Sequence, residues 1–456
     1  MRHTVAAAGL AQAARLITRS TASPATFTAA RATIVAGRRY ASGSRTSSRA
    51  SAWTRPVLPP KTPFAASSPR YFSTPSTTQD PVFHAGEAPS FAFAFDIDGV
   101  LLHVAKPIPG ATEALKYLQD NNIPFILLTN GGGKHETDRV KDLSAKLGLQ
   151  LSVDNFVQSH TPFQELVHGP EGLSDKTVLV TGSNAQKCRE IAERYGFKSV
   201  ITPADILLAH PDVWPFEPLR EELYERTARP LPRPLHTGKP GIQDADALKV
   251  DAIFVFNDPR DWALDIQIIM DLLLSRQGIM GTYSPKNGNA DLPNGGWQQD
   301  GQPLLIYSNA DLLWPTTYHQ PRFGQGAFQA AIDGVWSQVT GGRELGKTFY
   351  GKPFAETYQF AERVLNTHRA EVLRSGGGGG DKALKPLKTV YMVGDNPASD
   401  IRGANEFKSR HGTEWTSVLV RTGVWTPERG DGGHKPKKIV DDVKAAVAWA
   451  LKREGH

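Results

Sequence analysis

The chain has 456 residues, enough for two domains, and carries 52 basic against 46 acidic residues. The positive excess lies in residues 1–79, which hold ten Arg and one Lys; beyond them 41 basic residues face 46 acidic ones, a net charge of −5. This distribution argues against a surface that binds polyanions, so no nucleic-acid partner is expected. The single cysteine, Cys188, excludes an internal disulfide and a cysteine-based metal cage, and no apolar stretch reaches 18 residues, so no transmembrane span is predicted.

Residues 1–80 have the composition of a mitochondrial transit peptide. They are rich in Arg, Ser, Thr and Ala, and the first acid is Asp80. The segment predicts a mitochondrial location, with the matrix favoured because one free cysteine suits a reducing compartment. A disordered tail without a targeting role is the alternative. Residues 70–73 and 39–41 are two candidate processing sites.

From residue 91 onward strand-like and helix-like segments alternate, which predicts an α/β fold with a mostly parallel sheet and helices on both faces. Strands are predicted over 91–95, 125–128, 177–180, 253–256 and 389–393, and helices over 110–121, 136–147, 184–195 and 263–275. The polar segment 283–302 predicts a surface loop, and the Gly-rich segment 375–381 predicts a flexible insertion.

Polar residues follow the predicted strands at the points where the strands end. Asp96 and Asp98 come directly after 91–95. Thr129 follows 125–128, and Asp395 follows 389–393. Because open α/β sheets bind ligands at the carboxyl ends of their strands, we expect these side chains to lie together. Two acids so close cannot both stay ionised without a cation, which predicts a divalent metal and a phosphoryl substrate.

The residue types are chemically complementary. A carboxylate can accept a phosphoryl group to give an aspartyl-phosphate, and a second acid can protonate the leaving oxygen and then activate water. Lys352, in Gly351-Lys352-Pro353, and a hydroxyl would orient phosphoryl oxygens, while carboxylates suit Mg²⁺. Singly, each piece has a plainer interpretation as a turn, a helix cap or a structural residue. Their occurrence together, in this order and mostly at strand ends, favours catalysis.

In order, these pieces resemble motifs I to IV of the haloacid dehalogenase superfamily. Asp98 implies a phosphatase, because true dehalogenases lack this second acid and P-type ATPases place Thr there. The resemblance implies that Asp96 is the nucleophile and Asp98 the general acid and base. It also implies that Thr129 binds the phosphoryl group and that Lys352 holds Asp96 and the phosphoryl group. The implied metal is Mg²⁺, and its implied ligand set is Asp96, Asp98, Asp395 and Asp400, the last acting in support.

Motifs II and III are 223 residues apart, far more than a crossover connection needs, so a domain must lie between them. This insertion resembles the C2-type α/β cap of the NagD-like subclass (IIA), with further similarity in segments 308–311 and 323–326. Segments 256–262 and 314–319 are most similar to the mitochondrial group called cat eye syndrome critical region protein 5. The predicted division is a core in two parts, 81–176 and 346–456, with the cap at 177–345.

The substrate is expected to contact the loop after motif II and the loop after a cap strand. The residues expected to bind it are Asn130, Gly131, Asn257, Asp258 and Arg260. For the second loop a plain helix N-cap by Asp261 is an equal alternative.

The resemblance implies a mitochondrial, Mg²⁺-dependent phosphatase that hydrolyses a small phosphomonoester through an aspartyl-phosphate. A small phosphorylated metabolite or a phospholipid headgroup is the expected partner, linked by resemblance alone to glycerophospholipid metabolism, and a homodimer is left open. One alternative is a catalytically weak or inactive binding or scaffold protein, against which the intact charge cluster counts. Another is an inner-membrane lipid transferase, against which the lack of predicted spans counts.

Overall fold

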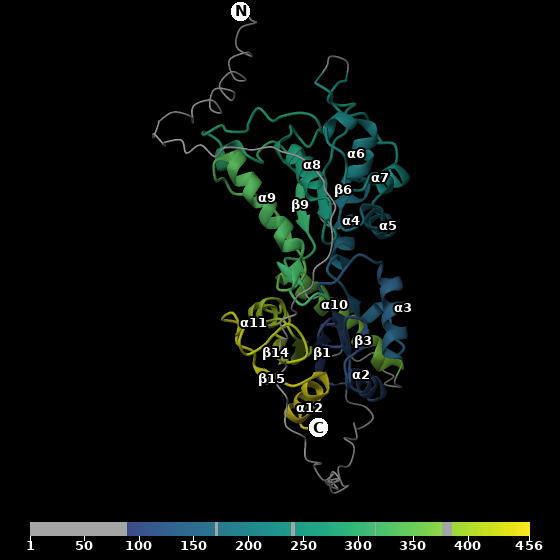
Figure 1. The fold of residues 1–456 in the computed structure, drawn as a ribbon. Helices are drawn as coiled ribbons and strands as arrows, with labels where there is room; N and C mark the ends of the chain where they lie inside the picture. The colour runs from purple at the N-terminus through teal and green to yellow at the C-terminus, as the bar shows by residue number, and fades with distance from the viewer. Residues whose placement is uncertain (1–88, 169–171, 239–241, 315, 376–384) are drawn as a thin grey trace, which may run out of the picture. The chain divides into compact units, whose positions relative to one another are not determined.

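The computed structural model describes residues 89–456 except 169–171, 239–241, 315 and 376–384 (Figure 1). The predicted transit peptide and the Gly-rich run at 376–380 lie outside the described residues. Every strand and helix predicted above is confirmed to within one residue at each end. Among the described helices, none has both the length and the apolar character needed to cross a membrane.

The first sheet has six strands, all parallel, in the order β15-β14-β13-β1-β4-β5. Their bounds are β1 (Phe91–Phe95), β4 (Phe125–Leu128), β5 (Phe156–Val157), β13 (Thr389–Gly394), β14 (Glu414–Val420) and β15 (Lys438–Val440). The order places β1 between β13 and β4, so residues that follow these three strands emerge side by side.

Helices cover both faces of the first sheet because successive side chains of a strand point to opposite faces. The phenylalanines of β1 pack with α2 (Ala111–Asp120), α3 (Glu136–Leu147) and α12 (Val443–Glu454). Its alanines, Ala92 and Ala94, pack with α10 (Ala355–Ser375) and α11 (Arg402–Glu406). All five residues of β1 are buried, as expected of a central strand in an α/β sheet.

The second sheet is also parallel, with the order β12-β9-β8-β6-β7. Its strands are β6 (Thr177–Thr181), β7 (Ser199–Ile201), β8 (Ala252–Val255), β9 (Leu304–Tyr307) and β12 (Thr348–Phe349). One face packs on α6 (Pro203–Ala209), α8 (Trp262–Leu274) and α9 (Gln325–Thr340), and the other on α5 (Ala185–Tyr195). Strand β12 carries this sheet past residue 345 and ends three residues before Lys352.

The remaining elements are short. They are the antiparallel pairs β2 (Leu102–His103) with β3 (Lys106–Pro107) and β10 (Leu313–Trp314) with β11 (Arg322–Phe323), the helices α4 (Glu165–His168) and α7 (Glu221–Thr227), and the π-helical turn η6 (Pro397–Ile401). Five 3₁₀ turns complete the set within the described residues: η1 (Val153–Asn155), η2 (Thr161–Gln164), η3 (Leu173–Asp175), η4 (Pro211–Val213) and η5 (Pro293–Gly296). The fold is thus the predicted α/β class, with two parallel sheets.

Candidate active site

Lys352 joins the ends of two strands of the first sheet. Its Nζ donates to Asp96 Oδ1 at 2.6 Å and to the carbonyl oxygen of Leu128 at 2.8 Å. It also lies 2.7 Å from Asp400 Oδ1. Only 2% of Lys352 and 8% of Asp96 are exposed, so these charges meet away from bulk water. The ammonium therefore fixes the candidate nucleophile at the carboxyl end of β1.

Backbone amides hold the acids that follow β13. Asp400 Oδ2 accepts hydrogen bonds from the amides of Asp395 and Asn396, at 3.1 and 3.0 Å, and Asp395 Oδ2 accepts one from Val424 at 2.7 Å. A Cβ added at Gly423 would lie 1.9 Å from Asp395 Oδ2, so only glycine permits this approach. The η6 turn thus turns Asp400 back toward its own strand end.

Three buried carboxylates form a group that suits a metal ion. Asp96, Asp395 and Asp400 each offer an oxygen within 4.8 Å of the others. Asp400 Oδ1 lies 2.7 Å from Lys352 Nζ and has no other partner among the described residues. One ammonium balances only part of this negative charge, and hard oxygen donors are what Mg²⁺ prefers. The residues therefore fit Mg²⁺.

The electrostatics of the group follow from burial. Burial raises the pKa of Asp96 to about 7; Lys352 opposes this rise, while Asp400 and Asp98 add to it. Burial and the neighbouring Asp96 and Asp400 also raise the pKa of Asp395 well above its usual range. Burial alone would lower the pKa of Lys352, but the two carboxylates beside it raise that pKa, so the ammonium stays charged.

The loop after β4 carries Thr129, Asn130 and Gly131. Thr129 is buried, and its Oγ1 accepts the Gly131 amide at 3.0 Å. Asn130 spans to the Lys352 segment: its Oδ1 accepts the Lys352 amide at 2.7 Å, and its Nδ2 donates to the Lys352 carbonyl at 2.9 Å. Asn130 thus positions Lys352, and both ends of its amide already have protein partners. A Cβ added at Gly131 would lie 3.3 Å from Thr129 Oγ1 and 3.7 Å from Asp98 Oδ2, so this loop passes beside Asp98.

Asp98 differs from the other acids in its exposure. About half of its side chain (51%) is exposed, and its Oδ2 lies 3.9 Å from a guanidinium nitrogen of Arg139 on α3. Asp98 is absent from the buried carboxylate group of Asp96, Asp395 and Asp400. A carboxylate open to solvent beside the candidate nucleophile can exchange protons with water and with a bound substrate.

Some side chains of the predicted substrate loop after β8 already have hydrogen-bond partners within the protein. Asn257 bonds Ser183 at both ends of its amide, accepting from the backbone N–H at 2.7 Å and donating to Oγ at 3.0 Å. Asp258 is half-buried, which raises its pKa, and lies 3.9 Å from the half-exposed Arg260. Asp261 is the N-cap of α8, accepting from the Leu264 amide, as the alternative interpretation expected.

Two residues that were not among the predicted site residues lie at the site. After β9, Asp311 Oδ2 accepts a hydrogen bond from Asn130 Nδ2 at 3.0 Å, and burial raises the pKa of Asp311 to about 6. Asn309 donates to the Asn130 carbonyl at 3.4 Å. The apolar run at 304–307 followed by polar residues was the sequence signal that could have identified them.

Sequence analysis also missed a buried hydrogen-bond network beside the loop after β4. His160 accepts a hydrogen bond from the Gly133 amide at Nε2 (3.4 Å), and its Nδ1 lies 2.8 Å from the Tyr195 hydroxyl. Tyr195 in turn donates to Glu136, which also accepts from Thr161 at 2.7 Å. The network joins the loop after β4 to helix α5, and its residues are far apart in sequence.

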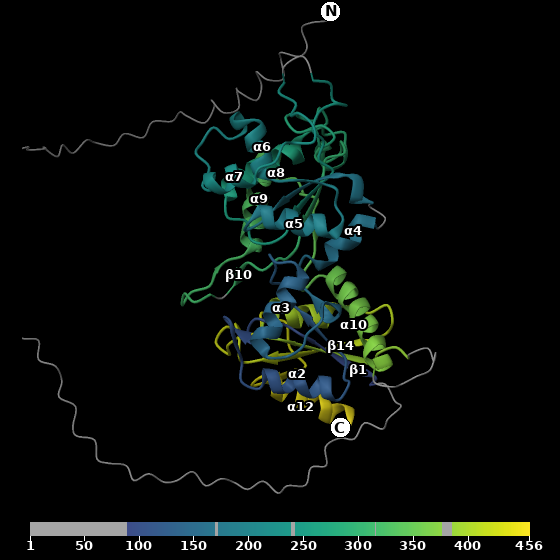
Figure 2. The same ribbon diagram turned by 90° about the vertical axis from the view of Figure 1, so that its right-hand side faces the viewer.

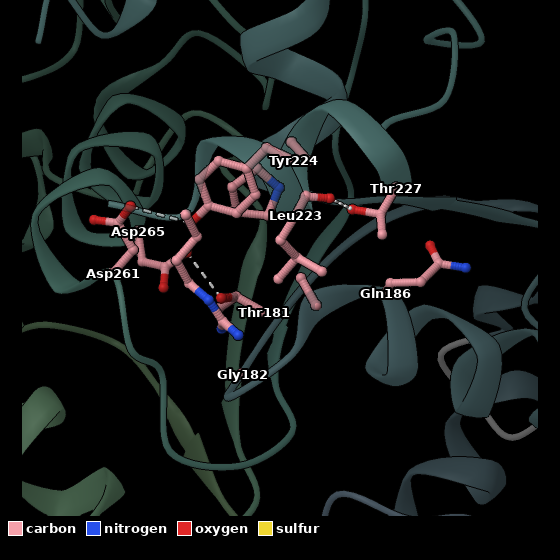
Figure 3. Close-up of a pocket in the computed structure, with 12 residues that line it drawn as sticks. Thr181, Gly182, Gln186, Leu223, Tyr224, Thr227, Asp261 and Asp265 are labelled. Atoms are coloured by element: carbon pink, nitrogen blue, oxygen red, sulfur yellow. Dashed lines mark hydrogen bonds between the residues drawn. The ribbon is translucent and has the colours of Figure 1, made fainter. Parts of the chain in front are cut away.

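A small cavity lies among the helices of the second sheet (Figure 3). In it Thr181 donates to Asp265 at 2.8 Å and Tyr224 donates to Asp261 at 3.1 Å, and burial raises the pKa of Asp265 to about 7. Its volume of about 10 Å³ has room for roughly one water molecule. It is too small for a phosphorylated metabolite.

Comparison with known proteins agrees with this geometry. Residues 93–198 match the family model described as haloacid dehalogenase-like hydrolase, and residues 349–446 match the one described as HAD-hydrolase-like. The two matches contain Asp96 and Thr129, and Lys352 and Asp395, respectively.

Two curated yeast proteins are similar over most of this chain. A mitochondrial hydrolase of Saccharomyces cerevisiae is 38% identical over 372 residues, which cover 79% of this chain and 96% of that protein. A cardiolipin synthase (CMP-forming)/mitochondrial hydrolase fusion protein of Schizosaccharomyces pombe is 39% identical over 391 residues, 84% of this chain but only 56% of the fusion. Among solved structures, p-nitrophenyl phosphatase from Archaeoglobus fulgidus has 17% identity and a TM-score of 0.49, covering 80% of this chain and 100% of that one. The chain belongs to the haloacid dehalogenase-like hydrolases.

Proposed function

We propose that this hydrolase is a Mg²⁺-dependent mitochondrial phosphatase that acts on a small phosphomonoester through an aspartyl-phosphate on Asp96. The observation that carries the proposal is the buried contact between Lys352 and Asp96, surrounded by further carboxylates. Such a cluster is costly to bury and stabilises the fold poorly, so its presence points to chemistry.

The first half of the reaction transfers the phosphoryl group to the protein. An oxygen of Asp96 attacks phosphorus, a new P–O bond to the carboxylate forms, and the P–O bond to the leaving group breaks. Asp98, half-exposed beside the site, gives its proton to the leaving oxygen. Thr129 and the amides of the loop after β4 would orient the phosphoryl oxygens, while Lys352 keeps Asp96 aimed at phosphorus.

The second half releases phosphate. Asp98, now ionised, takes a proton from water, whose oxygen attacks phosphorus and displaces the Asp96 carboxylate. Asp96 and Asp395, with the main-chain carbonyl of Asp98, would hold Mg²⁺, and Asp400 would position Lys352 and the Asp395 backbone. When bound, Mg²⁺ would neutralise charge on the phosphoryl oxygens and the carboxylates.

The relatives support location and substrate class. Both yeast relatives are named as mitochondrial hydrolases, in line with the composition of residues 1–80. The fission yeast protein joins its hydrolase part to a cardiolipin synthase by name, which supports a glycerophospholipid intermediate or headgroup as substrate.

The test is phosphate release from a panel of phosphomonoesters, including glycerol phosphates and lipid headgroup phosphates, with and without Mg²⁺. The Asp96→Asn variant should lose nearly all activity, and Asp138→Asn, which changes an exposed acid on α3, should keep it. Thermal stabilisation by Mg²⁺, measured in parallel, reports whether the metal binds. If a folded, Mg²⁺-stabilised wild type releases phosphate from nothing, the proposal fails and a binding or scaffold role takes its place.

A further inference from the structure

The segment between β9 and α9 exposes an unusual set of apolar side chains. Residues 312–323 form a hairpin in which β10 pairs with β11, named here the apolar hairpin; residue 315 lies outside the described part. Its large apolar side chains are substantially exposed: Leu312 (55%), Leu313 (44%), Trp314 (39%), Tyr318 (52%) and Phe323 (66%). Figure 2 shows the hairpin, labelled β10, as a narrow arm that leaves the body of the second sheet. Several large apolar side chains exposed on one short hairpin are typical of an interaction site.

The exposed side chains lie on both faces of the hairpin. Leu313 and Trp314 are consecutive in β10 and therefore point to opposite faces, as do Arg322 and Phe323 in β11. A folded protein partner would cover one face of a two-stranded ribbon and leave the other in water. The interfacial layer of a bilayer can contact both faces, because water and headgroups there still satisfy the open edges of the ribbon.

The polar groups of the hairpin suit the interface of an anionic bilayer. Trp314 Nε1 donates to the Phe323 carbonyl at 3.2 Å, so the indole N–H has a partner inside the hairpin. The Arg322 guanidinium lies 4.6 Å from the centre of the Tyr318 ring, and the hairpin contains no Asp or Glu. Trp and Tyr favour the headgroup level of membranes, and arginine is attracted to anionic lipid.

The base of the hairpin lies at the candidate active site. Asp311, directly before it, accepts a hydrogen bond from Asn130. Backbone hydrogen bonds from Gly324 to Leu312 (2.9 Å) and from Gly326 to Asp311 (3.0 Å) close this base. Contact between the arm and a bilayer would therefore bring the Asn130 loop close to the level of lipid headgroups.

We propose that the apolar hairpin seats the protein on an anionic phospholipid bilayer, and that the substrate is a phosphomonoester carried by a lipid in that bilayer. The substrate part rests on the proposed phosphatase function. The membrane contact does not, because it can be measured without turnover.

The binding test is flotation of the full chain with vesicles of phosphatidylcholine alone and of phosphatidylcholine with phosphatidylglycerol. A Leu313→Ser/Trp314→Ser/Phe323→Ser variant should bind the anionic vesicles at least about tenfold more weakly than wild type. The control Phe216→Ser/Leu219→Ser changes two side chains that are at least as exposed (66% and 76%) but lie in the loop before α7. Wild type and all variants keep the basic residues 1–79, so any contribution of these residues to vesicle binding is the same in each protein. Equal binding by wild type and the triple variant would overturn the membrane contact.

The activity test compares p-nitrophenyl phosphate with a lipid phosphomonoester presented in the same vesicles. The triple variant should keep kcat/KM on the soluble ester and lose at least about tenfold on the vesicle substrate. Equal activity on the vesicle substrate would overturn the substrate assignment, and no release from either substrate would instead refute the phosphatase function. Sedimentation of each variant tests the alternative that the hairpin binds a second copy of the chain. A wild-type dimer that becomes a monomer in the triple variant, with vesicle binding unchanged, would establish that alternative and overturn the membrane contact.

Discussion

Replacing Lys352 by Met tests the charge balance of the site in metal-free protein. The variant keeps the aliphatic stem but leaves Asp96 and Asp400, 8% and 0% exposed, without their shared cation. Removing one partner of a buried ion pair costs about 3–5 kcal/mol, which corresponds to a fall in Tm on the order of 10 °C. Lys347→Met is the control, because the ion pair of Lys347 with the more exposed Asp333 is worth at most about 1 kcal/mol.

The stability lost on replacing Lys352 by Met should depend on pH, and this dependence is the more specific part of the prediction. The folded-state pKa of Asp96 is raised to about 7, so stability from its protonated form is present at acid pH and is lost as pH rises toward 7. Without Lys352 that pKa rises further, so the variant should fall behind wild type more at about pH 8 than at about pH 5. Thermal unfolding in chelator at both pH values measures the difference. A loss that is the same at both, or no larger than that of Lys347→Met, would refute the charge argument.

Three further outcomes follow from buried groups outside the carboxylate cluster. Tyr195→Phe removes the hydroxyl between His160 and Glu136 and should lower the free energy of unfolding in urea by about 1–3 kcal/mol, whereas a loss below about 0.5 kcal/mol would contradict the network. Burial lowers the pKa of His160 to about 4, so the unfolded chain binds more protons between pH 4 and 6.5; stability should fall by about 3 kcal/mol on acidification through that window, and His160→Gln should flatten this part of the profile. Burial raises the pKa of the Cys188 thiol to about 12, so iodoacetamide should label it only in unfolded protein, and rapid labelling of the folded chain would show that the thiol is accessible.

Local pattern predicted the elements that lead into the site. The apolar runs at β1, β4 and β13 each end on a polar residue, and their bounds were predicted closely because buried parallel strands are continuously apolar. The structure brings Asp96, Lys352, Asp395 and Asp400 together, with Thr129 on the neighbouring strand end. Sequence order alone already suggested that meeting, since adjacent strands share one edge.

What the sequence could not reveal depends on contacts between distant residues. Asn130 and Asp311 are 181 residues apart, and no local pattern indicates that the side-chain amide of Asn130 hydrogen-bonds Asp311 and Lys352. The same holds for Asn257, whose hydrogen bonds to Ser183 at both ends of its amide join residues 74 positions apart, while its contact with substrate stays a prediction. A polar residue at a strand end is predictable; its partner is fixed only by tertiary packing.

The placement of Asn130 has a consequence for how this enzyme can change. The acids and the lysine of the proposed chemistry follow strands of the first sheet or β12, whereas Asp258, Asn309 and Asp311 follow β8 and β9 of the second. Asn130 contacts both groups, through Lys352 on one side and Asp311 on the other. Under the proposed function, we expect variation after β8 to alter which molecule is admitted, whereas a change at Asp311 would also disturb Asn130 and, through it, Lys352. Libraries confined to residues 258–260 would therefore be the natural starting material for directed evolution toward new phosphate esters.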